Sequence, residues 1–581
     1  MKKIITRTTK YFNEGVKNVL DDTLINEGAA SDSMNFVTLP DRIELILGRR
    51  LLGEEAEGND QVLGAGEILK EDGTKLLLRK VGTSLEYFDT ETQTWEESKT
   101  GLLDGEKMYF SSSFTPAGRQ IWACGQDGLF KIYPSNPETV LDLTDPLKNY
   151  KGRIEIVRSR MLCWGMKEDP TGLRFSRVDT DSNYNLVSGE AVGVAGSTTY
   201  EDTLALGEVF GVVFTDGTQT VTDDKNGKLE GDGTGTINYA TGEYSVEFDS
   251  VATSDVTVSY VYENSLDKGL ADFTSSATRL AGEGNVIRQD SLGSITHGVF
   301  VFGDVFYSLQ DKGSWTVRVS TDDLTFDNQI YRSSIACPSY LGGVVTADGI
   351  VFVDTFNSDY PKLRLLRFNQ LGDKVVPEDL SREFKMEDYT FDEDTAMWKK
   401  KDWVLISCKR NSTRNNVILI YNLIQKSFDV VNYTSNVFLE LENKIIAGDS
   451  LSPNMYELFT GRDDLDFEIE AFWEGKRSDL KIEDLKKYKR ERIGGFIEES
   501  QSFDILASYD NDSFEYVGSV SGTGNYVDKE NSIAIGSSIV GADVLGGESD
   551  AVANYFMTEI RVRTPKFLTR KLRFVPTGIG T

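Results

Sequence analysis

The chain has a single histidine, His297, and a Ser-His-Asp or Cys-His-Asp catalytic arrangement would need it as the general base. His297 lies in the segment SITHGVFVF, directly before an apolar run that predicts a strand. A lone histidine in such a strand is more often a packing residue than a base. We therefore assign no catalytic residue and expect a protein that is not an enzyme.

Sequence motifs for other chemistry are also absent. The chain has no GxSxG, HExxH or Walker loop, and no GxGxxG that opens a helix. A pair of carboxylates for glycoside hydrolysis stays open, because 93 Asp and Glu residues always offer candidates. Nothing in the sequence selects one pair.

Two further patterns were weighed as metal or redox sites. The segment DDKNGKLEGD offers oxygen ligands at Asp223, Asp224, Asn226 and Asp232, but it lacks the Asp-x-Asp-x-Asp-Gly spacing of a calcium loop. We favour a plain turn there. The four cysteines lie far apart without CxxC spacing, which argues against a zinc site or a disulfide scaffold. We expect no metal and no cofactor.

Composition indicates many short strands. The 581 residues are 39% hydrophobic and 11% aromatic, with 53 Gly and only 12 Pro, enough for several cores joined by tight turns. No run of about 18 apolar residues predicts a membrane helix, and the first residues lack the apolar core of a secretory signal. The net charge of −31 disfavours binding to nucleic acid.

A small turn recurs along the chain. In FDTETQTW, Phe88 precedes Asp89 and Trp95 follows, and YNLIQKSF at 421–428 repeats this frame. FNQLGDKV at 368–375 and YPSNPETV at 133–140 fit it too. Each turn ends a meander of roughly 40 residues with period-two apolar patterning, and we predict that it leads to the outer strand. Such sheets bury both faces only by stacking around an axis, so we predict a β-propeller of six or seven units.

Two regions interrupt this repeat. Cleanly alternating strands with Asp/Gly/Thr-rich loops predict a small Ig-like β-sandwich at 188–265, inserted in a propeller loop. From 463 onward the pattern predicts a second β-sandwich. Bases cluster there, as a docking face for an acidic neighbour or as a solvated strand face: Lys476, Arg477, Lys481, Lys486, Lys487, Lys489, Arg490, Arg492, Arg561, Arg563, Lys566, Arg570, Lys571 and Arg573.

The predicted fold class is therefore all-β: a β-propeller-like core with an inserted small β-sandwich and a C-terminal β-sandwich. The predicted divisions are an extended N-terminal arm (1–53), the core (54–187 plus 266–462), the insertion (188–265) and the C-terminal domain (463–581). The polar, strand-poor arm is suited to lying across a neighbouring subunit.

The segment from Tyr11 to Gly53 resembles the opening of tail proteins from double-stranded DNA bacteriophages. GDGTGTINYATGEYSVEF is similar to sandwich modules of phage virion proteins, and FWEGKRSDL with the following KKYKRERIGGFIE and FDILASYD resembles the end of phage tail-hub proteins. In the first segment the matching residues are Asn13, Gly15, Leu24, Glu27, Gly28, Ala29, Asp32, Asn35, Phe36, Ile43, Gly48 and Arg49.

The resemblance to tail hub or nozzle proteins of short-tailed phages implies a structural role in the virion. Such proteins form a ring, typically a hexamer, below the portal and adaptor. They extend the DNA-ejection channel and hold fibres or a needle. The protein would be assembled in the host cytoplasm, and an acidic wall would let DNA pass without binding.

Two alternatives stay open. One is a minor tail or tip protein of a long-tailed phage. The other is a glycan-binding or glycan-cleaving propeller for host attachment, with a pocket lined by aromatics such as Trp398 and Trp403, although burial in a core explains both.

Overall fold

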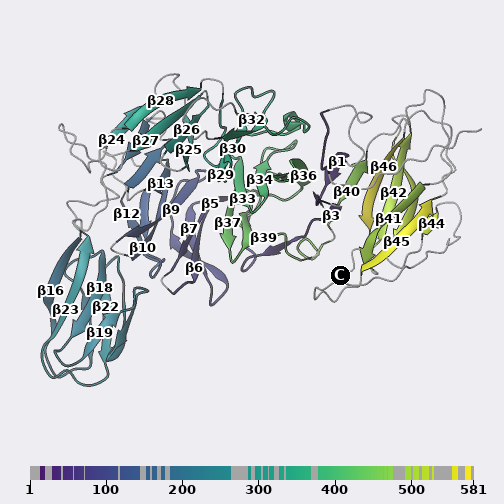
Figure 1. Ribbon diagram of the computed structural model, residues 1–581. Helices are drawn as coiled ribbons and strands as arrows, with labels where there is room; N and C mark the ends of the chain where they lie inside the picture. Colours follow the sequence, from purple (N-terminus) through teal and green to yellow (C-terminus); the bar gives the residue numbers. More distant parts are fainter. Residues whose placement is uncertain are drawn as a thin grey trace, which may run out of the picture.

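A computed structural model describes residues 14–19, 29–143, 152–165, 172–176, 184–263, 285–288, 295–319, 326–367, 377–475, 491–498, 502–521, 526–528, 553–560 and 570–577, apart from shorter gaps inside these ranges. Nearly all regular structure in these residues is strand, and the only helical turn among them is the 3-10 turn η3 (Met386–Asp388). The all-β prediction is confirmed. Figure 1 shows the propeller in the middle, the inserted module below it and the C-terminal sheet beside it.

Seven four-stranded antiparallel sheets in the described part of the chain form the blades. Blade 1 consists of β5 (Val62–Leu69), β6 (Lys75–Val81), β7 (Ser84–Asp89) and β8 (Thr94–Lys99). Blade 2 consists of β9 (Met108–Thr115), β10 (Gly118–Gly125), β11 (Gly128–Ile132) and β12 (Val140–Asp142). Blade 3 consists of β13 (Arg153–Val157), β14 (Arg160–Trp164), β15 (Gly172–Phe175) and β24 (Asn285–Arg288).

Blades 4 to 7 follow in chain order, and the last takes its outer strand from the N-terminal region. Blade 4 consists of β25 (Thr296–Phe302), β26 (Val305–Gln310), β27 (Ser314–Val319) and β28 (Phe326–Arg332), and blade 5 of β29 (Gly343–Thr346), β30 (Gly349–Asp354), β31 (Lys362–Arg367) and β32 (Glu378–Asp379). Blade 6 consists of β33 (Ala396–Lys400), β34 (Trp403–Cys408), β35 (Val417–Asn422) and β36 (Ser427–Val431). Blade 7 consists of β37 (Val437–Leu441), β38 (Lys444–Gly448), β39 (Met455–Leu458) and β4 (Arg49–Leu51).

Alternating side chains explain why the blades stack. On β14, Met161 and Cys163 pack against blade 2, whereas Leu162 and Trp164 pack toward blade 4. A strand between two neighbours must be apolar on both faces, because successive side chains point in opposite directions. An apolar cluster lies at each of the seven blade-to-blade boundaries, including the closing one between blades 7 and 1.

The recurrent turn has a common geometry in blades 1 and 6. Asp89 and Asn422 each accept a hydrogen bond on the side-chain oxygen from the amide two residues on, at 2.8 and 3.0 Å. Gln93 and Lys426 each take a left-handed conformation, with φ of 61° and 55°. The turn leads from the third strand to the outer strand, as predicted. The copy at 368–375 lies outside the described residues.

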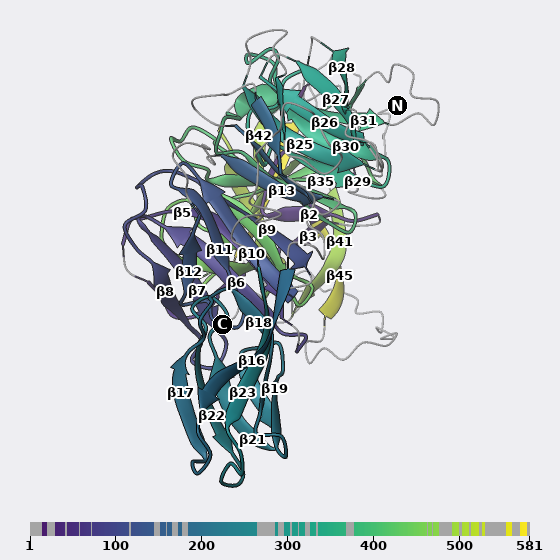
Figure 2. The same cartoon turned by 90° about the vertical axis from the view of Figure 1, so that its left-hand side faces the viewer.

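The insertion leaves blade 3 between β15 and β24 and contains eight strands. They form one continuous antiparallel sheet in the order β16, β23, β18, β19, β20, β21, β22, β17, so both faces of the predicted sandwich belong to the same sheet. It projects from one side of the propeller (Figure 2). The strands are β16 (Tyr184–Gly193), β17 (Thr199–Thr203), β18 (Val209–Thr215), β19 (Thr220–Asp223), β20 (Lys228–Gly231), β21 (Gly233–Ile237), β22 (Glu243–Phe248) and β23 (Val256–Glu263).

The module is docked on blade 2. The Tyr239 ring lies 6.2 Å from the Tyr133 ring, centre to centre. The Asn238 side chain donates to the Thr139 hydroxyl at 3.0 Å. Lys131, buried in blade 2, forms an ion pair with Glu208 of the module at 3.1 Å. Apolar, polar and charged contacts therefore fix its orientation.

The described part of the N-terminal segment contains more strand than expected, and two of its strands pair with strands of the same chain. β1 (Ala30–Met34) pairs with β40 (Phe472–Gly475) in the C-terminal sheet, and β4 is the outer strand of blade 7. Between them, the hairpin of β2 (Phe36–Thr38) and β3 (Ile43–Leu45) packs on β36. These strands are too short for periodicity to reveal, and they cross between propeller and C-terminal sheet of the same chain (Figure 1).

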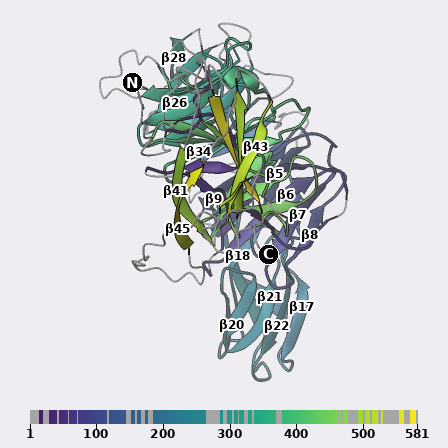
Figure 3. The same cartoon turned by 90° about the vertical axis from the view of Figure 1, so that its right-hand side faces the viewer.

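The C-terminal region has a six-stranded sheet, in which β1 is an edge strand, and a two-stranded ribbon. Seen from the side of this region, these strands lie in front of the propeller (Figure 3). Glu474 of β40 forms ion pairs with Lys571, at 2.7 Å, and with Arg573. The remaining strands are β41 (Glu491–Glu498) and β45 (Ala553–Ile560) in the ribbon, and β42 (Ser502–Tyr509), β43 (Glu515–Ser521), β44 (Tyr526–Asp528) and β46 (Arg570–Thr577) in the sheet.

Candidate functional site: the axial end of the propeller

The loops that precede the inner strands meet at one end of the propeller axis. The loop 392–395 enters blade 6, and Lys107 precedes the inner strand of blade 2. Nζ of Lys107 lies 3.1 Å from Oδ1 of Asp394 and 2.6 Å from the Glu393 carbonyl oxygen, to which it donates. Blades 2 and 6 are not neighbours in the ring, so these contacts reach across the axis.

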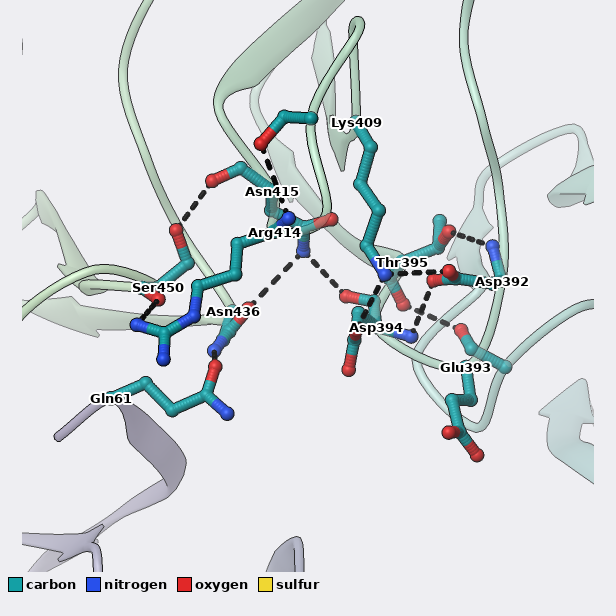
Figure 4. A network of polar contacts seen from close by, with 12 residues as sticks. Gln61, Asp392, Glu393, Asp394, Thr395, Lys409, Arg414, Asn415, Asn436 and Ser450 are labelled. Atoms are coloured by element: carbon teal, nitrogen blue, oxygen red, sulfur yellow. Dashed lines mark hydrogen bonds and ion pairs between the residues drawn. The ribbon is translucent and has the colours of Figure 1, made fainter. Parts of the chain in front are cut away.

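A second lysine holds the same acidic loop from blade 6. Nζ of Lys409 lies 2.6 Å from Asp392 and 2.7 Å from Asp394 (Figure 4). Burial alone would raise the pKa of Asp394, but the ion pairs with Lys107 and Lys409 outweigh it and hold that pKa below its usual value. Burial lowers the pKa of Lys107, and Asp394 offsets part of that effect. The cluster is held as paired charges.

Asn415 links the loop to blade 7. Its Nδ2 donates to the carbonyl oxygens of Asp394 and Ser435, at 2.7 and 3.0 Å (Figure 4). Nδ2 of Asn436 donates in turn to the Gln61 side chain at 3.0 Å, which joins blades 7 and 1. Buried polar groups bonded in this way specify one arrangement of the loops.

Tyr340, which precedes blade 5, lies on the opposite side of this end. Its hydroxyl donates to the Gly165 carbonyl of blade 3 at 3.0 Å. Its ring lies 5.1 Å from that of Tyr109 in blade 2 and 5.7 Å from that of His297 in blade 4. Burial raises the pKa of Tyr340 to about 12. Tyr340 and the loop 392–395 together bring side chains from several blades into contact at the axis.

His297, the sequence candidate for a base, is placed at this end. Its carbonyl accepts a hydrogen bond from Nε1 of Trp164 at 3.0 Å, and burial lowers the pKa of its imidazole. No serine or cysteine side chain forms a hydrogen bond with its imidazole among the described residues. This geometry fits the packing role predicted for His297.

The carboxylates of the DDKNGKLEGD loop serve the backbone of the module. Asp223 accepts from the amides of Lys225, at 2.7 Å, and Gly211 and from the Tyr239 hydroxyl. Asp224 accepts from the amides of Asn226 and Lys228, at 2.7 and 3.0 Å. In the part of the chain that the structure describes, no group of His, Cys, Asp and Glu is arranged to hold a metal ion.

The remaining candidates divide between core and undescribed residues. Trp398 and Trp403 pack against the apolar cluster between blades 6 and 7. The four cysteines are buried and form no disulfide bond: Cys124, Cys163, Cys337 and Cys408. Most of the C-terminal bases lie outside the described residues, and Lys571 and Arg573 are paired with Glu474. The described residues contain no helix of the length and apolar character that a membrane crossing needs.

Sequence reasoning missed the axial end itself. Its members come from all seven blades, so no local spacing connects them. The one available signal is the presence of charges at alternate positions of inner strands, such as Arg153 and Glu155 in RIEIV, because one face of an inner strand looks toward the axis.

No family model matches the chain, and no curated protein matches it. Among solved structures, AztD of Citrobacter koseri is similar with 11% identity and a TM-score of 0.27, over 67% of this chain and 93% of that one. The endosialidase of phage phi92 has 10% identity and a TM-score of 0.21, over 92% of this chain and 70% of that one. Hydrazine synthase of Kuenenia stuttgartiensis has 12% identity and a TM-score of 0.23, over 64% of this chain and 80% of that one. Scores this low carry no argument about function.

Proposed function

We propose that the protein is a structural subunit of a bacteriophage tail, a nozzle or hub component that stands in a ring around the DNA path. The observation that carries the proposal is the bonded axial end of the propeller. Ligand sites are concave and present a few free polar groups. Around the loop 392–395, Lys107, Lys409, Asp394 and Asn415 are bonded to one another or to backbone, so this part of the axial end offers a ligand few free polar groups.

The way in which the chain ties its parts together also supports a mechanical role. One segment, residues 30–51, supplies strands to the C-terminal sheet and to blade 7 and a hairpin against blade 6. Separating the propeller from the C-terminal sheet would break the ladder of β1 and β40. A tail component that transmits force during DNA ejection needs such coupling.

Charge gives a third line of support. DNA carries one negative charge per about 1.7 Å of axis, and a net charge of −31 disfavours its adhesion to the protein. The conduit in this proposal lies between the subunits of the ring, since the propeller axis itself is crossed by side chains. The alternative of a minor tail or tip protein shares these features and differs in its position in the virion.

A second candidate, glycan binding for host attachment, is favoured by one loop of blade 5. Phe356 and Tyr360 are 51% and 61% exposed in the loop between β30 and β31. Exposed aromatic rings are the usual platforms for sugars. Trp398 and Trp403, the sequence candidates for this role, lie against the core instead.

Electron microscopy of the purified protein and of phage particles tests the proposal. The expected result is a ring of copies, six by the resemblance, around an open channel at the tail. A protein that stays monomeric at high concentration and is absent from particles would overturn it. A glycan array with the wild type and with Phe356→Ala/Tyr360→Ala separates the second candidate, because only specific sugar binding would be lost in the double variant.

A further inference from the structure

Arg153, the first residue of β13, has an unusual environment at the axial end. Its guanidinium carbon lies 5.9 Å from the ring centre of Tyr109 and 5.5 Å from that of Trp164. Among the described residues it forms no ion pair, and its Nη1 is buried without a hydrogen-bond partner. The two rings pack against the guanidinium, but they do not accept a hydrogen bond from its Nη1.

An open donor on a buried guanidinium is costly. A buried charge without a partner loses its hydration and gains nothing in exchange, and arginine cannot avoid this by losing its proton. Burial lowers the pKa of Arg153, which reports the same cost. The nearest carboxylate on the strand, Glu155, forms no ion pair with Arg153, and burial raises the pKa of Glu155. Glu155 attracts Arg153 from beyond ion-pair distance, and no carboxylate among the described residues binds the guanidinium directly.

A second open group lies on the other side of Tyr340. Nδ1 of His297 is also buried without a partner, and the His297 ring lies 5.7 Å from the Tyr340 ring. Arg153 and Tyr109 keep part of their accessible surface, whereas Nη1 does not. A solute can therefore touch the exposed part of Arg153 and Tyr109, and it reaches Nη1 only when a neighbouring side chain moves aside. Lys107 is no competitor for such a solute, because Asp394 and Glu393 already occupy it.

We propose that a small monovalent anion with a carboxylate group binds to Arg153 at the axis, beside Tyr109 and Tyr340. The planar guanidinium matches the two oxygens of a carboxylate. Glu155, two residues along the same face of β13, disfavours a doubly charged anion such as phosphate. This inference concerns the propeller alone and does not depend on the role in a phage tail.

Thermal unfolding of the full chain in sodium formate or acetate, at fixed ionic strength, tests the site. A ligand that binds only the folded state raises Tm in a saturable way. In Arg153→Gln the apparent affinity falls at least about tenfold, since hydrogen bonds to a charged group are lost. The control Arg367→Gln, which removes an exposed pair with Glu378, keeps the wild-type response.

A second variant is expected to raise the apparent affinity for the anion, and it keeps the proposal testable if Arg153→Gln does not fold. Glu155→Gln removes a like charge near the anion, so formate and acetate should bind several-fold more tightly. The affinity for phosphate should increase by a larger factor, because phosphate carries more negative charge. A wild type without saturable dependence on either carboxylate would overturn the proposal. So would a dependence that Glu155→Gln leaves unchanged, since water alone would then satisfy Nη1.

Discussion

Blades 3 and 7 both complete their sheets with a strand that is distant in sequence, and they hold it by different means. In blade 3, β24 returns after more than 100 residues and pairs with β15 over four positions. In blade 7, β4 comes from the other end of the chain and pairs with β39 over three. The two ends of the module lie close together, because Tyr184 pairs with Glu263.

The blade 7 strand has no such tether and relies on side chains. Arg49 of β4 donates to both carboxylate oxygens of Asp464, at 2.7 and 2.9 Å. Its guanidinium also lies 4.8 Å from the Tyr433 ring centre and 5.0 Å from that of Tyr456. An insertion whose ends meet adds little closure entropy, whereas a strand recruited from a distant terminus needs an anchor.

The largest effect is expected at that anchor. Arg49→Ala leaves Asp464 without its partner and removes both ring contacts, so the free energy of unfolding should fall by about 3–4 kcal/mol. Urea denaturation of the full chain measures it. Lys444→Ala, on the same blade, removes a more exposed pair with Glu457 and should cost under about 1 kcal/mol. Equal losses in the two variants would break the comparison.

The next effect concerns the neighbouring anchor of the N-terminal segment. Asp429 of β36 accepts from the amide and hydroxyl of Thr38, at 2.9 and 2.6 Å. Burial nevertheless raises the pKa of Asp429 from 3.8 to about 6. Because the folded state binds this proton more tightly than the unfolded state, its contribution to the free energy of unfolding falls as pH rises from about 4 to 6, by up to about 3 kcal/mol.

Asp429→Asn removes this titration and keeps an oxygen for Thr38. The difference in unfolding free energy between variant and wild type should therefore grow in favour of the variant between pH 4 and 6 and stay constant above. Urea denaturation at pH 4.5, 5.5 and 7 follows it. A difference independent of pH would show that Asp429 does not titrate in this range.

A smaller effect is expected where the module docks. Glu208→Gln removes the charge opposite Lys131, and the free energy of unfolding should fall by about 2 kcal/mol. Glu201→Gln, on an exposed strand of the module, is the matched control and should change it by under about 0.5 kcal/mol. An unchanged free energy of unfolding in Glu208→Gln would mean that docking of the module through this ion pair does not stabilise blade 3.

The smallest effect belongs to the recurrent turn. Lys426 takes a left-handed conformation that glycine adopts without cost and alanine does not. Lys426→Gly should therefore be about 1 kcal/mol more stable than Lys426→Ala, and the same pair of variants at Gln93 should differ alike. A difference at only one site would show that the two turns are not equivalent.

These contrasts also mark what the sequence could reveal. Period-two patterning and the Asp89 and Asn422 turns predict the blades, because both are local. The blade number was open between six and seven, since blade 3 is interrupted and blade 7 borrows its outer strand. Strands as short as IEL and RRL, in β3 and β4, carry no period of their own. The strand β4 pairs with β39, which lies some 400 positions away in the sequence.

The axial end was out of reach for the same reason. Lys107, Tyr340 and Asp394 are separated by long stretches of sequence, and only closure of the ring brings them together. The packing role of His297 could be predicted because one strand pattern sufficed. The contact of Arg153 with Tyr109 could not be predicted, because Tyr109 belongs to blade 2, whereas Trp164 lies opposite Arg153 in the same hairpin.

The two ends of the N-terminal segment impose an order on synthesis. At 5–20 residues per second, the ribosome needs roughly 20–80 s after β4 has emerged to deliver β39 and β40. During that interval β1 and β4 lack their partner strands β40 and β39, and blade 1 lacks the neighbouring blade 7. Ring closure is consequently a late event in synthesis, and a chain that stops short of residue 458 cannot complete it.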